Sequence, residues 1–117
     1  MLPKKQRLTS VEIEEVMIKG KPLFSDFFVV KFIKNHTLEI AQGFKISAVS
    51  PKKPFSTAAL RNKARRRIYS ALTSFLETQK PKSGLLIAIV GNKKVLDIPL
   101  SDLSFSLEQT FRKGGIL

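Results

Sequence analysis

The sequence predicts an α/β (α+β) two-layer sandwich, with helices packed on a central sheet in the order α-β-β-α-β-(β)-α. Three observations support this fold class. Segments with the apolar spacing of a helix lie near both ends and in the middle of the chain. Segments rich in β-branched and aromatic residues separate them, and residues 85–90 are apolar without interruption. Three helices and one sheet favour a sandwich, and 117 residues are enough for one compact domain.

The first helix is predicted for residues 10–19. Thr9 and Glu12 have the spacing of a capping box, in which each side chain accepts a hydrogen bond from the other residue's backbone N–H. Gly20 is a suitable C-cap, and Pro22 prevents the helix from resuming. Residues 1–8 are expected to form an extended N-terminal segment of a single domain that comprises residues 1–117.

Strands are predicted on both sides of the middle helix. Residues 24–32 are rich in β formers, and Asn35-His36 marks a break, after which a second extended segment is expected. Residues 44–49 alternate between apolar and polar side chains, which is typical of a strand with one covered face. Residues 84–91 are apolar on both faces, which predicts a buried central strand. Residues 95–98 are expected to add an edge strand.

Two further helices complete the predicted fold. The longer one runs from about residue 57 to residue 78, with Ser56 or Thr57 as its N-cap. The last helix begins near Pro99 and ends at the pair Gly114-Gly115.

The helix at 57–78 is apolar on one side and cationic on the other. Its apolar positions recur at spacings of three and four: Leu60, Ala64, Ile68, Leu72 and Phe75. Asn62 and Arg66 lie opposite that face, Lys63 and Arg65 flank them, and Arg61 and Arg67 fall near its borders. Residues 40–76 contain no acidic residue, and three lysines extend the same positive field: Lys45, Lys52 and Lys53.

This charge distribution predicts a nucleic-acid partner. The net charge is +12, and a polyanion with regularly spaced phosphates is the natural counterpart of a fixed cationic face. A merely solvated face is the alternative, but such faces usually interleave acids with the bases, and this one does not. A membrane surface is a weaker alternative, because the apolar face of this helix is needed for the core.

Several other classes of function lack the residues they need. The chain has no cysteine and one histidine, His36, which we interpret as a solvated turn residue. It shows no Gly-rich phosphate loop, no metal-ligand cluster and no catalytic constellation, so we expect no catalytic residue and no metal site in the protein itself. The longest apolar run is too short to span a bilayer, and the N-terminus does not resemble a signal peptide. A cytoplasmic protein is expected.

At this point the motifs, taken in order, resemble those of one family, the bacterial ribonuclease P protein component. The resemblance extends over nearly the whole chain. It is carried by MLPK…RL and VMIKG (residues 1–8 and 16–20), FFVVKF (27–32), SAVS and KK (47–53), AALRNKARR (58–66) and LEQTFRK (107–113).

The resemblance implies the small protein subunit of a ribonucleoprotein endonuclease. In that family the catalytic RNA holds the active site and its Mg²⁺ ions, and it hydrolyses the phosphodiester that joins the 5′ leader to precursor tRNA. The protein docks on this RNA and holds the leader, and neither a membrane nor a protein partner is required. The implied fold has a central mixed sheet with a left-handed βαβ crossover, against the usual right-handed rule.

The resemblance also implies two sets of site residues. Those matched to docking on the RNA subunit are Arg61, Asn62, Lys63, Arg65, Arg66, Lys52 and Lys53. Those matched to a leader cleft between the first helix and the sheet are Ile13, Met17, Phe28, Lys31 and Lys45.

Several matched positions depart from the family pattern. Lys63 replaces an arginine, which keeps the charge but loses the bidentate fork. Ile13 and Met17 stand where the family places aromatic residues, and together with Phe28 they can equally be plain core residues. Arg67 replaces an aliphatic residue and is expected to extend its charge to solvent.

Two rival functions remain. A small ribosomal or ribosome-associated RNA-binding protein would share the charge and the fold but would need no leader cleft. A protein-only nuclease would need a carboxylate cluster that binds metal, and only the scattered Asp26, Glu39 and Asp97 are available.

Overall fold

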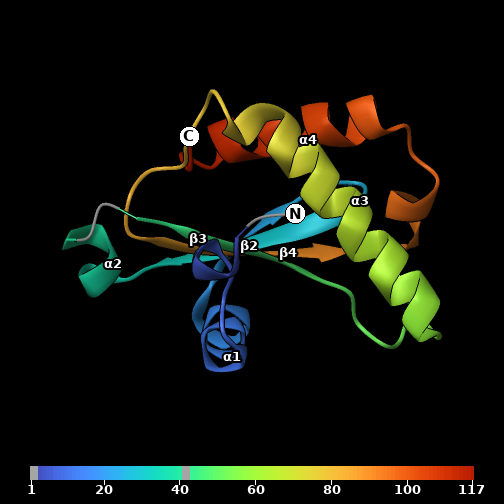
Figure 1. Ribbon diagram of the computed structural model, residues 1–117, viewed down its shortest axis with the longest axis horizontal. Helices are drawn as coiled ribbons and strands as arrows, with labels where there is room; N and C mark the ends of the chain where they lie inside the picture. The colour runs from blue at the N-terminus through green and yellow to red at the C-terminus, as the bar shows by residue number, and fades with distance from the viewer. Residues whose placement is uncertain (1–2, 41–42) are drawn as a thin grey trace.

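A four-stranded sheet with helices on both faces forms the protein (Figure 1). The computed structural model describes residues 3–40 and 43–117. The strands are β1 (Lys21–Phe24), β2 (Phe28–Lys34), β3 (Lys45–Val49) and β4 (Leu85–Gly91), in the spatial order β1-β2-β4-β3. Strand β2 pairs antiparallel with β1 and β4, whereas β3 and β4 are parallel, so the predicted mixed sheet is confirmed.

The three predicted helices all form in the described part of the chain. They are α1 (Ser10–Lys19), α3 (Ala58–Leu76) and α4 (Leu100–Lys113). Helices α3 and α4 lie side by side over one face of the sheet, and α1 lies alone on the opposite face (Figure 1). The α+β sandwich is therefore confirmed, and α1 adds a partial layer on its second face.

The predicted caps form as their side chains require. The Thr9 hydroxyl accepts from the backbone N–H of Glu12 at 3.2 Å, and the Glu12 carboxylate accepts from the backbone N–H of Thr9 at 2.9 Å. Gly20 caps the other end of α1. At the start of α3, Thr57 rather than Ser56 is the N-cap, because its hydroxyl accepts from the backbone N–H of Leu60 at 3.2 Å.

Alternation along the strands divides the core into two clusters. Residues that face α3 and α4 include Phe28, Val30, Ile46, Ile87 and Ile89, and they form the main core. Leu86 and Ala88 face the other way and form a smaller core with Leu8 and Val16 beneath α1. Strand β4 is buried on both faces, as its uninterrupted apolar sequence predicts.

Four local predictions differ from the structure. The single strand expected at residues 24–32 is two strands, because Ser25 turns the chain and its N–H donates to the carbonyl of Phe28 at 3.0 Å. The second extended segment begins instead with a short helix, α2 (His36–Ile40), which lies beyond the end of the sheet (Figure 1). Residues 41–42 of that segment lie outside the described part of the chain. Among the described residues no strand pairs with α2, so its backbone forms its hydrogen bonds locally.

The other two differences are at residues 95–98 and at the N-terminus. The expected edge strand is a 3-10 helix, η2 (Lys93–Leu96), because β4 is already flanked by β2 and β3. Asn92 caps this turn by accepting from the N–H of Lys94 at 2.9 Å. The N-terminal segment is not extended throughout, since Lys4–Gln6 form a 3-10 turn, η1. Residues 1–2 lie outside the described part of the chain.

The crossover from β3 through α3 to β4 joins two parallel neighbouring strands, as the family resemblance implies. Its left-handed sense stays a prediction. The connection matters for function because it projects the first turns of α3, with their cations, from the edge of the sheet that β3 forms (Figure 1).

Candidate nucleic-acid interface

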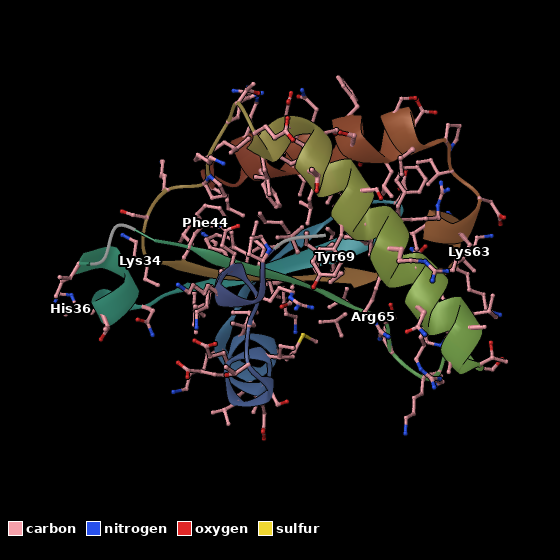
Figure 2. All side chains as sticks on the ribbon, viewed as in Figure 1. Lys34, His36, Phe44, Lys63, Arg65 and Tyr69 are labelled. Carbon is pink, nitrogen blue, oxygen red and sulfur yellow. The ribbon has the colours of Figure 1, made fainter. Side chains whose placement is uncertain are left out.

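The first half of α3 presents the predicted cationic face. Ala64, Ile68 and Leu72 are buried against the core, and Asn62, Lys63 and Arg66 are exposed. Arg65 is half-buried, and its Nη2 donates to the Asn62 side-chain oxygen one turn away. Lys63 and Arg65 lie on opposite flanks of the helix (Figure 2). The helix therefore offers positive charge over a broad arc rather than along one line.

Arg61 does not share the freedom of its neighbours. Its Nη1 donates to the carbonyl of Phe55 at 2.9 Å, and its own carbonyl accepts from the Ser50 hydroxyl at 3.1 Å. These two bonds attach Ser50, just before the 51–57 loop, and Phe55, within it, to the first turn of α3. Arg61 is half-buried, so it positions the loop and has only part of its guanidinium available for RNA.

The 51–57 loop presents Lys52 and Lys53 to solvent beside the start of α3. Phe55 anchors the loop, because its side chain is fully buried in the main core. The Phe55 N–H also donates to the carbonyl of Pro51 at 3.3 Å and closes a turn. This anchor was not predicted from the sequence. The signal that could have indicated it is an aromatic residue in a short loop, placed after two prolines and before the N-cap of a helix.

Arg67 has a structural role that was not predicted from the sequence. Its Nε donates to the carbonyl of Val95 at 2.7 Å, and its Nη2 donates to the carbonyl of Ile98. The side chain therefore points at η2 and ties this turn to α3. The expectation that Arg67 extends its charge to solvent is wrong.

Helix α1 and the face of the sheet beneath it together carry four of the five predicted cleft residues. Ile13 and Met17 are half-buried and pack against the smaller core. The register places Lys31, Ala88 and Ser47 in one row across β2, β4 and β3. Both lysines of this face are attached to α1: Lys31 Nζ donates to the Met17 carbonyl at 3.0 Å, and Lys45 Nζ lies 3.0 Å from the Glu12 carboxylate.

The Glu12 carboxylate therefore makes two interactions: it accepts the capping-box hydrogen bond from Thr9, and it forms an ion pair with Lys45. Partial burial by itself raises the pKa of Glu12, but the hydrogen bond from the Thr9 backbone and the bond and charge of Lys45 outweigh it. The net result is a pKa below the ordinary value. The carboxylate stays ionised near neutral pH and neutralises part of the charge of Lys45.

Phe28 is not part of this face. It is buried in the main core among residues that α3 and α4 cover, on the opposite side of the sheet from α1. Alternation along β2 directs Lys31 and Ile33 toward α1, and therefore directs Phe28 and Val30 away from it. The assignment of Phe28 to the leader cleft is corrected, and its alternative interpretation as a core residue holds.

A hollow of about 340 Å³ connects the α1 face with the flank of α3. It is lined by Arg7, Leu8, Thr9, Ile13, Ser47, Ala48 and Tyr69. The Tyr69 hydroxyl accepts from the N–H of Ala48 at 3.1 Å at the open edge of β3, and the Ser47 hydroxyl accepts from the N–H of Leu8 at 2.8 Å. Tyr69 lies on the same flank of α3 as Arg65 (Figure 2). Arg7 and Tyr69 were not among the predicted site residues.

The described residues contain no group of three His, Asp or Glu side chains placed to hold a metal ion. In the part of the chain that the structure describes, no helix is long and apolar enough to cross a membrane. What the site contains is cations, amides and hydroxyls, which are groups that bind phosphate and sugar oxygens.

Comparison with known proteins assigns the family. The model of the Ribonuclease P family matches residues 2–115. The RNase P protein of Staphylococcus aureus has a similar structure, with a TM-score of 0.75 at 20% identity, over 95% of this chain and 96% of that one. The RNase P protein from Thermotoga maritima gives a TM-score of 0.73 at 21% identity, over 92% and 96%. No curated protein sequence gives a significant match. Because the family model matches almost the whole chain and the fold agrees with these structures, the protein belongs to the Ribonuclease P family and is an RNase P protein subunit.

Proposed function

We propose that this subunit binds the catalytic RNA of ribonuclease P through the first half of α3 and the 51–57 loop. The RNA carries the hydrolytic site and its Mg²⁺ ions, and the protein supplies no catalytic group. The observation that carries this proposal is the set of exposed cations on the 51–57 loop and the first half of α3, namely Lys52, Lys53, Lys63 and Arg66, supported by the half-buried Arg65 at one flank. Such a surface neutralises closely spaced phosphates where RNA strands approach one another.

We further propose that the 5′ leader of precursor tRNA lies along the face beneath α1. Ile13 and Met17 are half-buried there and offer apolar contact to bases, and Lys31 and Lys45 stand on β2 and β3, on either side of β4. The hollow beside Tyr69 joins this face to Arg65. One strand of RNA can therefore contact the α1 face and the flank of α3 without leaving the protein surface.

The two lysines of this face contact RNA only if they change partners. Lys31 donates to the Met17 carbonyl in the last turn of α1, and Lys45 is paired with Glu12. A phosphate that approached Lys45 would compete with the Glu12 carboxylate, so the gain in affinity from Lys45 is smaller than that from an unpaired lysine. We expect apolar contacts to contribute more to leader binding than these two charges do.

Cleavage of a precursor tRNA by matched RNase P RNA at low Mg²⁺ tests the docking proposal. The wild-type protein should restore cleavage, and Arg65→Ala/Arg66→Ala should not. Lys80→Ala/Lys82→Ala is the matched control, since it removes two charges beyond the far end of α3. The control variant should restore cleavage as well as the wild type does. An equal reduction of cleavage in both double variants would mean that net charge, and not this face of α3, holds the RNA.

The salt dependence of RNA binding supplies a second measure. Removing one cation that binds a phosphate should reduce the slope of log K against log salt by roughly one. Arg65→Ala/Arg66→Ala should therefore reduce the slope by about two, whereas Lys80→Ala/Lys82→Ala should leave it unchanged. If the protein bound RNA tightly but never restored cleavage at any Mg²⁺ concentration, the proposed docking would be wrong.

A further inference from the structure

A second groove lies between strand β1 and helix α4, at the opposite edge of the sheet from β3. Its volume is about 1000 Å³, which is at the upper end of the usual range for ligand sites, roughly 300–1,000 Å³. Pro22 and Phe24 line one wall, and Phe105, Gln109 and Lys113 line the other. It shares no lining residue with the α1 face or with the cationic half of α3.

Two exposed phenylalanines are among the residues that line this groove, one at the end of β1 and one on α4. Phe24 is 78% exposed and Phe105 is 65% exposed, although most other phenylalanines of the chain are buried or half-buried. Exposed aromatic residues gathered around one groove indicate a surface that a ligand covers. Neither ring is needed for the core, because Leu23 and Leu107 supply the inward contacts of β1 and α4.

The charges around the rings indicate an anionic ligand. Arg112 and Lys113 line the groove at the end of α4, both are exposed, and no acidic residue is among the lining residues. Glu108, which lies outside the lining, is 3.7 Å from Arg112 Nε and neutralises part of that charge, and Arg112 Nη2 donates to the side-chain oxygen of Gln79. The Arg112 guanidinium therefore already has two partners outside the groove lining. Lys21 begins β1 and is exposed beside the groove. Hydroxyl and amide groups of Ser106, Gln109 and Thr110 add hydrogen-bonding capacity between the cations and the rings.

The edge of β1 itself is unsuited to pairing with another strand. Pro22 has no N–H to donate to an added strand, and Lys21 places a charge at the strand's start. β1 is also only four residues long. An added peptide strand, or a second copy joined through β1, would therefore find few backbone partners here, and the ligand must be recognised by side chains.

We infer that this groove binds a segment of single-stranded RNA, with unpaired bases stacked on Phe24 and Phe105 and phosphates near Arg112 and Lys113. Aromatic rings combined with a basic groove are how proteins hold unpaired nucleotides with little sequence preference, and a paired base cannot offer its face to a ring in this way. The site is separate from the two surfaces of the proposed function, and it gives the subunit a second contact with unpaired RNA.

Binding of a ten-nucleotide single-stranded RNA to the full-length protein tests this inference. The Arg65→Ala/Arg66→Ala background reduces binding at α3. In that background, Phe24→Ala/Phe105→Ala should weaken binding at least about fivefold, which corresponds to the loss of one stacked base. Binding of a duplex of the same length should not change. Ile18→Ala is the control, since it removes an apolar side chain that is 74% exposed on α1, and it should bind as its parent does.

Photo-crosslinking with 4-thiouridine in the same oligonucleotide locates the contact on the wild-type protein. Crosslinks at peptides containing Phe24 or Phe105 support the inference. Absence of both crosslinks together with unchanged affinity of the phenylalanine variant would overturn it. A concentration-dependent dimer in sedimentation that Phe24→Ala/Phe105→Ala abolishes would also overturn it, because the groove would then bind a second copy.

The precursor tRNA assay separates this inference from the proposed function. Phe24→Ala/Phe105→Ala removes no residue of α3 and none of the four residues Ile13, Met17, Lys31 and Lys45, so it should still restore cleavage at low Mg²⁺. Failure of the wild-type protein to restore cleavage would count against the proposed function alone, and the crosslinks would still decide the groove.

Discussion

Arg67 of α3 and Val95 of η2 are joined by a hydrogen bond of 2.7 Å from the guanidinium Nε to the backbone carbonyl oxygen. A second bond from Nη2 to the carbonyl of Ile98 completes the attachment. One turn of α3 therefore carries two arginines with different environments. Arg66 is exposed to solvent, and Arg67 donates to the carbonyls of Val95 and Ile98, two residues whose side chains are buried.

This difference predicts that two adjacent substitutions affect different properties, one the stability of the protein and the other its RNA binding. Arg67→Met leaves two carbonyl groups without their donors and should lower the free energy of unfolding by about 1–3 kcal/mol. Arg66→Met should change it by no more than about 0.5 kcal/mol while weakening RNA binding. Urea unfolding and RNA titration of both variants measure the two effects. Equal stability of the two variants would show that the Arg67 bonds contribute nothing measurable.

Phe55 is expected to control both stability and the basic loop. Its side chain is fully buried, so Phe55→Ala should cost about 3–5 kcal/mol of unfolding free energy. Phe55→Leu keeps an apolar anchor and should cost less. In folded protein, the alanine variant should also weaken RNA binding, because the bond between Arg61 and the Phe55 carbonyl positions Lys52 and Lys53. Urea unfolding followed by RNA binding at low denaturant measures both effects.

Glu12 should make stability depend on pH in the acidic range. Its pKa in the folded protein lies below the ordinary value of about 4.5, so its stabilising contribution is complete above the pKa of the unfolded chain. That contribution is lost as the pH falls through the lower folded pKa. Unfolding free energies measured between about pH 3 and pH 6 should therefore fall less steeply in Glu12→Gln than in the wild type. Lys45→Met, which removes one cause of the shift, should give an intermediate slope.

Met17→Phe tests whether the α1 face contacts the leader. Base–aromatic stacking contributes roughly 1–3 kcal/mol per base, so the variant should bind precursor tRNA more tightly. Binding of mature tRNA, which has no leader, should not change. Ile18→Phe is the matched control, because Ile18 neighbours Met17 but is exposed. If Met17→Phe and Ile18→Phe changed the affinity ratio equally, Met17 would not touch the leader.

Local sequence determined the three longer helices, α1, α3 and α4, and most of their caps. The capping box at Thr9, the C-cap at Gly20 and the amphipathic pattern of α3 depend on residues within a few positions of one another, and each formed where expected. The cationic face of α3 follows from the same periodicity. The uninterrupted apolar run of β4 identified the central strand, since only a strand covered on both faces can bury it.

Only the tertiary structure decided which face of a strand a helix covers. Alternation along β2 places Phe28 and Lys31 on opposite sides of the sheet, but it does not determine which of these side chains points toward α1. Phe28 was therefore assigned to the wrong side. Residues 95–98 had the composition of a strand, but both neighbours of β4 were already in place, and η2 formed instead. Contacts of long sequence separation also set the tasks of Arg67 and Tyr69. Periodicity fixes which side chains share a surface, whereas the packing of distant segments fixes what that surface meets.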